Sequence, residues 1–126
     1  MRNAFQEELD SIHETLIKMG KIVEDSMSAA TRALLEPNLE LAEKVIKDDD
    51  TIDDMQHELD ARTMMIIARQ SPVAGDLRTL VTSLRMSADL ERMGDMAHHI
   101  AKLARMRYPN SAVPAGLKEI IQNMDR

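Results

Sequence analysis

The sequence predicts an all-α protein, an antiparallel up-down-up three-helix bundle followed by the start of a fourth helix. Three observations predict this fold. Apolar residues recur with helical spacing over three segments of roughly 30 residues. Prolines and polar turn residues separate these segments. Aromatic residues make up only 2% of the 126 residues, whereas a β-sandwich or barrel usually needs more of them.

The first predicted helix covers residues 3–35. Its apolar residues repeat every seven positions with a second apolar set between them, which is the pattern of a helix that buries one stripe against its neighbours. The first set is Leu9, Leu16, Val23 and Ala30, and the second is Phe5, Ile12 and Met19. Because short connections make sequential helices antiparallel neighbours, this stripe should face the two helices that follow.

The second predicted helix covers residues 38–70. It begins after Pro37 at Asn38, a residue type that often caps a helix N-terminus with its side chain. An apolar set again recurs every seven positions, at Val45, Ile52, Leu59 and Ile66. The interleaved positions are polar and hold Asp49, Gln56 and Thr63, so half of this seam departs from that of a simple bundle.

The third predicted helix covers residues 72–107. Ser71 can cap it, and Pro72 suits its first turn. Its inner face is predicted to change from an apolar stripe at Leu77, Leu80, Val81 and Leu84 to a small-residue face at Leu90, Gly94, Ala97, Ala101 and Ala104. Six methionines are expected in the core, with an adaptable partner surface as the alternative. They are Met64, Met65, Met86, Met93, Met96 and Met106.

A fourth helix is predicted to start at Pro114, because one helical face would hold Leu117, Ile120, Ile121 and Met124. A helix of a few turns is rarely stable without a partner. We therefore divide the chain into a three-helix domain, residues 1–108, and residues 109–126, a linker and the start of a further, truncated helix. Truncation would leave an apolar face uncovered, which predicts a homodimer.

Charge balance and missing residue types exclude several classes of function. Acidic residues outnumber basic ones by 22 to 16, for a net charge of −6, which argues against a general nucleic-acid binder. The absence of cysteine excludes a Cys nucleophile and thiolate metal sites, and it fits a cytoplasmic protein. Membrane insertion is not expected, because no apolar run approaches the length of a membrane span.

Two pairs of acidic residues are predicted to meet between the second and third helices. Asp49 and Asp53 are four residues apart, as are Glu91 and Asp95, so each pair shares a helix face. Asp53 precedes Pro72 by 19 residues and Glu91 follows it by 19, while Asp49 and Asp95 each lie 23 residues from it. In an antiparallel hairpin that turns at Pro72, the two pairs reach the same height.

Four carboxylates at one height repel one another, by roughly 3 kcal/mol for two charges 5 Å apart at an effective dielectric of 20. Carboxylates on facing helices are also how helical bundles build metal sites. The four are therefore candidate metal ligands: Asp49, Asp53, Glu91 and Asp95. Glu24 and Asp25 of the first helix reach the level of Asp49 if the chain turns near Pro37. The alternative is a set of solvated helix faces balanced by basic residues: Lys47, Arg92 and Lys102.

Two motifs of the third helix resemble the signature of the PhoU family, regulatory proteins of phosphate transport. They are PVAGDLR at residues 72–78 and DLERMGD at residues 89–95. Further matching positions lie in the first two helices: Met19-Gly20, Val23-Glu24, Val45-Ile46, Asp49, Ile52-Asp53 and Glu58. The resemblance covers residues 1–107, and Met93 stands where the family pattern has Ile or another aliphatic residue.

The resemblance implies two tandem three-helix repeats, of which this sequence is similar to the first and the start of the second. It implies a cytoplasmic negative regulator of the phosphate-starvation response that couples a phosphate ABC transporter to a sensor histidine kinase, and not an enzyme. It also implies metal bound through E(D)xxxD motifs, which map onto Asp49/Asp53 and Glu91/Asp95. The ion would be iron, zinc, manganese or magnesium.

Two other functions stay open at this point. The chain could be a metal-free helical scaffold and interaction module. It could also be a ferritin-like di-metal carboxylate enzyme, because Asp-x-x-His occurs at Asp10/His13, Asp54/His57 and Asp95/His98. The shorter Asp, and the predicted orientation of Asp54 away from the seam, disfavour this enzyme. His98 and His99 could add a ligand beside Asp95, although histidines in such positions are more often exposed.

Overall fold

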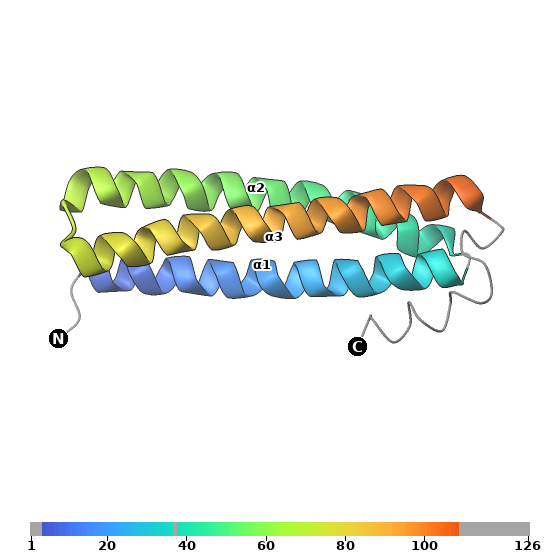
Figure 1. Cartoon of the computed structure of the whole chain (residues 1–126), viewed down its shortest axis with the longest axis horizontal. Coiled ribbons are helices and arrows are strands. Elements are labelled where there is room, and N and C mark those ends of the chain that lie inside the picture. Colours follow the sequence, from blue (N-terminus) through green and yellow to red (C-terminus); the bar gives the residue numbers. More distant parts are fainter. Residues whose placement is uncertain (1–3, 37, 109–126) are drawn as a thin grey trace.

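The computed structural model describes residues 4–36 and 38–108 and places them in three long helices. These are α1 (Ala4–Leu35), α2 (Leu39–Gln70) and α3 (Ala74–Arg107). They lie side by side, with the α1–α2 connection at one end of the molecule and the α2–α3 turn at the other (Figure 1). The all-α, up-down-up bundle is thus confirmed. The predicted fourth helix, with the whole of residues 109–126, lies outside the described residues.

The predicted seams of α1 and α2 form most of the core. On α1 the buried seam residues are Leu9, Ile12, Leu16, Met19, Val23 and Ala30, and on α2 they are Val45, Ile52, Leu59 and Ile66. Burying one such Leu or Ile side chain stabilises the fold by roughly 1.5–3 kcal/mol. The heptad pattern therefore identified the residues that hold α1 and α2 in the bundle.

The core has two parts that differ in side-chain size. Large side chains from Leu9 to Val23 of α1 pack with Ile52, Leu59 and Ile66 of α2 and Leu80 of α3. Beyond them lies an alanine-rich part, built on Ala29, Ala30, Ala33, Leu34, Ala42, Val45, Ala97, Ala101 and Ala104. The small residues of α3 allow its backbone to approach its neighbours closely. The carboxylates predicted to meet on α2 and α3 fall between these two parts.

The helix ends confirm one predicted cap and correct another. The Asn38 side chain accepts a hydrogen bond from the Leu41 backbone N–H at 3.1 Å, as predicted for the start of α2. Ser71 does not cap α3. It has a left-handed backbone, with φ of 43°, and ends α2. The next helix begins at Ala74, and Val73 at its N-cap makes no side-chain capping bond. The helical conformation is disfavoured before a proline, which explains why Ser71 belongs to the turn.

The inner face of α3 differs from the predicted one in its first half. Leu80 is buried, but Leu77 and Val81 are 38% and 37% exposed, and the inner face continues through Ser83 and Ser87. The predicted core position of the methionines is wrong, because all six are exposed: Met64, Met65, Met86, Met93, Met96 and Met106. A narrow face of small residues contacts both α1 and α2, so the larger side chains are displaced to its flanks. Within the described residues, none of the helices has a stretch long and apolar enough to cross a membrane.

Candidate functional site

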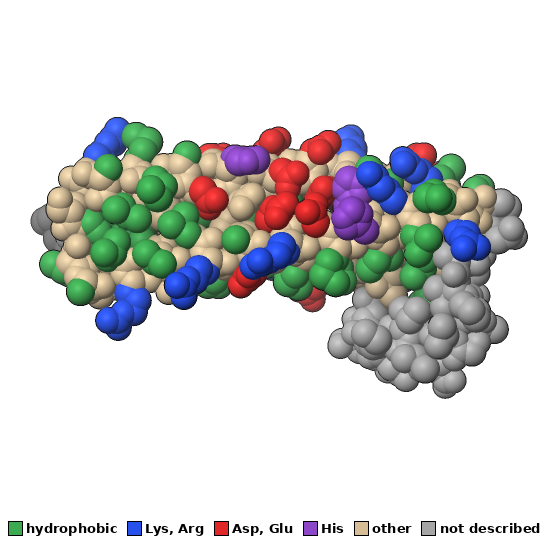
Figure 2. Space-filling model, turned by 45° about the horizontal axis from the view of Figure 1, so that its top comes forward, with side chains coloured by type: hydrophobic (Ala, Val, Ile, Leu, Met, Phe, Trp, Pro, Cys, Tyr) green, Lys and Arg blue, Asp and Glu red, His purple; other side chains and the backbone are tan. Residues whose placement is uncertain are grey.

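Acidic side chains gather near the middle of the molecule, with histidine beside them (Figure 2). Asp49 and Asp53 of α2 and Glu91 and Asp95 of α3 form what we call the carboxylate cluster. Asp49 is buried, with 5% exposure, and the other three are partly buried. Asp49 is a polar seam position of α2, and a simple bundle would fill it with an apolar side chain. Its position on the seam is the reason that it is buried.

The pKa values of two members are raised, and the causes agree with the predicted heights. The pKa of Asp53 is raised by burial and by the nearby charges of Asp49 and Asp95, although a hydrogen bond with Glu91 lowers it in part. The pKa of Glu91 is raised by burial, by the charges of Asp95 and Asp53, and by the same hydrogen bond. Asp53 and Glu91 therefore each lie near carboxylates of their own helix and of the facing helix, as the spacing around Pro72 predicted.

Asp49 contacts His98 of α3, a residue that the sequence analysis considered only as a further metal ligand. His98 Nδ1 lies 2.6 Å from Asp49 Oδ2, and the His98 side chain is only 20% exposed. An ionised carboxylate can only accept a hydrogen bond, so we assign the donated proton to Nδ1. In a neutral imidazole this leaves a lone pair on Nε2. The expectation that His98 is exposed is wrong, whereas its neighbour His99 is exposed.

Three polar atoms at the cluster are buried without a hydrogen-bond partner among the described residues. They are Asp49 Oδ1, Asp53 Oδ1 and His98 Nε2. A buried polar atom without a partner costs roughly 1–3 kcal/mol. All three are types of atom that bind metal ions. The donor chemistry of the cluster therefore fits a cation.

Gly94 makes room for the cluster on α3. A Cβ atom built at this position would lie 3.0 Å from Ile52 Cδ1 and 3.5 Å from Asp49 Oδ1. Even the Cβ atom of alanine would crowd the Ile52 side chain of α2. The glycine in the motif of residues 89–95 thus has a structural reason, which is close approach of the two helices at the site.

Basic side chains do not balance the carboxylate cluster. Arg92 pairs with Asp89, and Lys44 pairs with Asp48 at 2.9 Å, both on the surface. Across residues 4–36 and 38–108, the four carboxylates make no ion pair with a lysine or arginine. The alternative of helix faces balanced by Lys47, Arg92 and Lys102 therefore finds no ion pair to support it.

The side chains as they stand do not yet form a coordination site. Within the described part of the chain, no three His, Asp or Glu side chains are arranged to hold a metal ion. Glu24 and Asp25 are exposed and line a hollow between α1 and α3, so the cluster draws nothing from α1. His13 and His57 are exposed as well. The three Asp-x-x-His pairs therefore do not assemble into a ferritin-like centre.

The contact from His98 could have been found from spacing. His98 follows Glu91 by seven residues, two helical turns, so the two lie on the same face of α3. Asp49 and His98 differ by three residues in their distance from Pro72. The offset is about one turn of helix, within reach of an imidazole. Matching equal distances from Pro72 paired Asp49 with Asp95. It missed His98, whose longer side chain reaches Asp49 from about one helical turn away.

Fold and site together define an all-α bundle protein with a carboxylate cluster between two antiparallel helices. Residues 16–104 match the PhoU domain family over most of the three helices. The chain belongs to the PhoU domain family.

Curated relatives carry one functional description. A protein of Mycobacterium tuberculosis, the phosphate-specific transport system accessory protein PhoU homolog 2, is 40% identical over all 126 residues, which cover 59% of its own length. A PhoU homolog of Aquifex aeolicus is 46% identical over 77% of this chain and 44% of its own length. One from Rhizobium meliloti is 34% identical over 97% of this chain and 51% of its own. The chain thus spans about half the length of these relatives.

Proposed function

We propose that this protein regulates phosphate uptake as an accessory protein of a phosphate transport system. Membership of the PhoU domain family carries the proposal, because its relatives in three bacteria bear that description. The finer role is negative regulation of the phosphate-starvation response. In this role the protein couples a phosphate ABC transporter to a sensor histidine kinase in the cytoplasm.

Metal binding at the carboxylate cluster is the proposed chemical basis of this role. A cation would neutralise the repulsion that, together with burial, raises the pKa values of Asp53 and Glu91. It would also give partners to the buried oxygens of Asp49 and Asp53. Asp49 and Asp53 would hold the ion from α2, and Glu91 and Asp95 would hold it from α3. Oxygen donors favour magnesium, manganese or iron, while an imidazole nitrogen would also suit zinc.

His98 orients the cluster. Its hydrogen bond through Nδ1 fixes one oxygen of Asp49, and the other oxygen, which is buried without a hydrogen-bond partner, would bind the ion. A partner of this kind both positions a ligand and adjusts its basicity. A change in the charge of the carboxylate cluster would therefore change how α2 and α3 pack. A regulator needs such a change in structure in response to a signal.

A complementation experiment tests the regulatory role. A bacterial host that lacks its own protein of this type should express phosphate-starvation genes even when phosphate is abundant. The full chain should restore repression, and a chain with Asp49→Ala and Glu91→Ala should not. The control carries Asp54→Ala and Asp89→Ala, two exposed acids on the same helices, and should behave like the parent.

The outcomes separate the candidate functions. Failure of the parent chain to restore repression at normal expression would contradict the regulatory role for this chain. Repression by the parent and by the cluster variant alike would leave the regulatory role intact and contradict the part assigned to metal. That result would favour the metal-free interaction module.

A further inference from the structure

A stripe of apolar side chains runs along α3 between the α2–α3 turn and the carboxylate cluster. Its members are Leu77, Val81, Leu84 and Ala88. The same helical spacing continues into Glu91 and Asp95, so the stripe lies on the side of α3 that faces α2. Leu77 and Val81 are 38% and 37% exposed, and Leu84 and Ala88 are partly buried. Water therefore reaches much of this apolar stripe.

Apolar side chains of α2 extend this surface. Asp60 and Ile67 follow Asp53 at intervals of seven residues, so they share the face of α2 that bears the cluster. Met64, one turn beyond Asp60, is 56% exposed. Hydrophobic side chains gather accordingly near the α2–α3 turn, with acidic side chains beyond them toward the middle of the molecule (Figure 2). We call Met64, Ile67 and the α3 stripe the hairpin face. Apolar patches of this kind mark contacts with other proteins.

Asp60 is an acidic residue within the hairpin face that lacks a cation. It is partly buried, and its Oδ1 atom is buried without a hydrogen-bond partner in the described part of the chain. In that same part it forms no ion pair with lysine or arginine. Because this carboxylate has lost part of its hydration, a cation at its other oxygen stabilises it more than it would a fully exposed acid.

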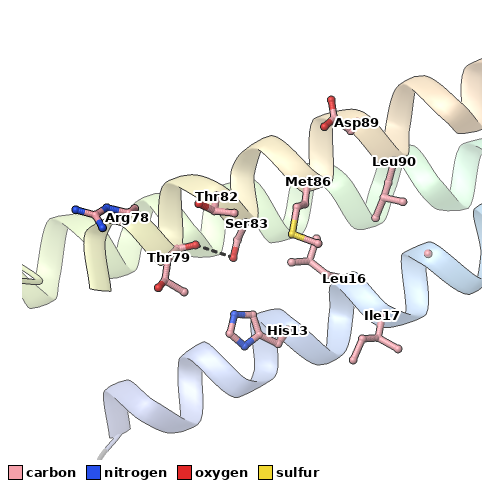
Figure 3. A pocket seen from close by; sticks show the side chains of 11 residues that line it. His13, Leu16, Ile17, Arg78, Thr79, Thr82, Ser83, Met86, Asp89 and Leu90 are labelled. Atoms are coloured by element: carbon pink, nitrogen blue, oxygen red, sulfur yellow. Dashed lines mark hydrogen bonds between the residues drawn. The ribbon is translucent and has the colours of Figure 1, made fainter. Parts of the chain in front are cut away.

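Two arginines border the α3 stripe on its outer side. The buried Ser83 and Ser87 lie on the inner side of the stripe, and Arg78 and Arg85, seven residues apart, lie on the other side. Figure 3 shows Arg78 pointing away from the hollow of about 680 Å³ between α1 and α3. Both arginines are exposed, and neither forms an ion pair within residues 4–36 and 38–108. One surface thus carries an acid without a cation and arginines without an acid.

Asp60 and Arg85 lie at nearly the same height along the bundle. Asp60 precedes Pro72 by 12 residues and Arg85 follows it by 13, an offset of one residue or about 1.5 Å. The two charges lie on opposite sides of the apolar stripe. A two-fold axis along the stripe, parallel to α3, therefore places Asp60 of one copy against Arg85 of another at two equivalent contacts. The same axis packs stripe against stripe.

We propose that two copies of this chain associate in parallel through the hairpin face, with Asp60 of each copy paired with Arg85 of the other. This pairing assigns a surface to the homodimer predicted from the sequence. The charges favour a second copy as the occupant, because the face is complementary to itself. Neither a metal ion nor the regulatory role is needed for this association, so its test is independent of the proposed function.

Charge reversal in the full chain tests the pairing. The test variants are Asp60→Arg and Arg85→Asp, each of which places like charges together at both contacts. The controls Glu58→Arg and Lys21→Asp reverse exposed charges outside the hairpin face. Sedimentation equilibrium gives the Kd of the dimer over protein concentrations from about 1 μM to 1 mM. Circular dichroism verifies that every variant keeps the helix content of the parent.

The proposal predicts loss and recovery of the dimer. Each test variant should raise the Kd at least about tenfold, because two attractive contacts become repulsive, and each control should change it less than about threefold. An equimolar mixture of the two test variants should regain the Kd of the parent, because each contact then joins an arginine to an aspartate. The double variant Asp60→Arg/Arg85→Asp should regain it as well.

Three results would overturn the proposal. The first is a parent chain that stays monomeric over the whole concentration range. The second is a dimer that the test variants weaken no more than the controls do, which would place the contact on another surface. The third is a mixture of the two test variants that associates no better than either variant alone, which would exclude the pairing of Asp60 with Arg85.

Discussion

Replacing Asp53 by asparagine should stabilise the metal-free protein at neutral pH. Asp53 and Asp49 are one helical turn apart, which places their Cβ atoms about 5–6 Å apart. Two charges 6 Å apart repel by about 3 kcal/mol at an effective dielectric of 20 and by about 0.7 kcal/mol in water. Because Asp53 is partly buried, we expect Asp53→Asn to raise the free energy of unfolding by about 1–2 kcal/mol at pH 7.

Burial and the same repulsion together predict the pH dependence. The pKa values of Asp53 and Glu91 are raised in the folded protein from their ordinary values of 3.8 and 4.5. Between the ordinary and the raised pKa values, the folded state therefore binds more protons than the unfolded state. The free energy of unfolding must fall as pH rises through this window and must increase as pH is lowered from neutral toward the ordinary values. In Asp53→Asn this increase should be smaller.

Urea unfolding in the presence of a chelator, followed by far-ultraviolet circular dichroism between about pH 5 and 8, measures both effects. Asp54→Asn is the matched control, because Asp54 is the next residue of α2 and is exposed. It should leave the free energy of unfolding within about 0.5 kcal/mol of the parent. Destabilisation of the protein by Asp53→Asn at pH 7 would contradict this prediction. So would a pH dependence in Asp53→Asn that equals that of the parent and of the Asp54→Asn control.

Three further tests concern the packing of α3, the cap of α2 and the close approach at Gly94. Leu80→Ala should lower the free energy of unfolding by about 2–5 kcal/mol because Leu80 is fully buried, whereas Leu77→Ala should cost less than about 1 kcal/mol; equal costs would contradict the inner face assigned to α3. Asn38→Ala should cost about 1 kcal/mol through loss of the cap of α2, and no loss would argue against that cap. Gly94→Ala should cost about 1 kcal/mol or more through its contact with Ile52 Cδ1. The cost should disappear in an Ile52→Val background, and additive effects in the double variant would exclude that contact. Denaturant unfolding measures all three.

The sequence predicted the helices and the core of α1 and α2 well, because both depend on local periodicity. A residue seven positions from Leu9 or Val45 lies on the same helix face, whatever the partner helix is. Periodicity failed on α3, where Leu77 and Val81 are exposed and Ser83 and Ser87 are buried. Small and polar residues form much of the inner face of α3, so a search for apolar residues at helical spacing could not identify it there.

The candidate site, too, could be predicted in the part that depends on spacing along the helices and not in the part that depends on side chains. The heights of Asp53 and Glu91 could be predicted because a helical hairpin makes distance from the turn equivalent to height along the bundle. The contact between His98 and Asp49 depends on side-chain length and helix rotation, and counting residues missed it. Whether Asp49, Asp53, Glu91 and Asp95 bind metal stays a prediction.

The metal content of the purified protein shows whether the carboxylate cluster binds an ion. The full chain is exposed separately to iron, zinc, manganese and magnesium, freed of unbound ions by gel filtration and subjected to elemental analysis. We predict that the parent retains at least one of these ions near-stoichiometrically. The control with Asp54→Ala and Asp89→Ala should retain it as well, and the variant with Asp49→Ala and Glu91→Ala should lose it. Equal retention by the parent and the cluster variant, or no retention of any ion by the parent, would contradict the carboxylate cluster as a metal site.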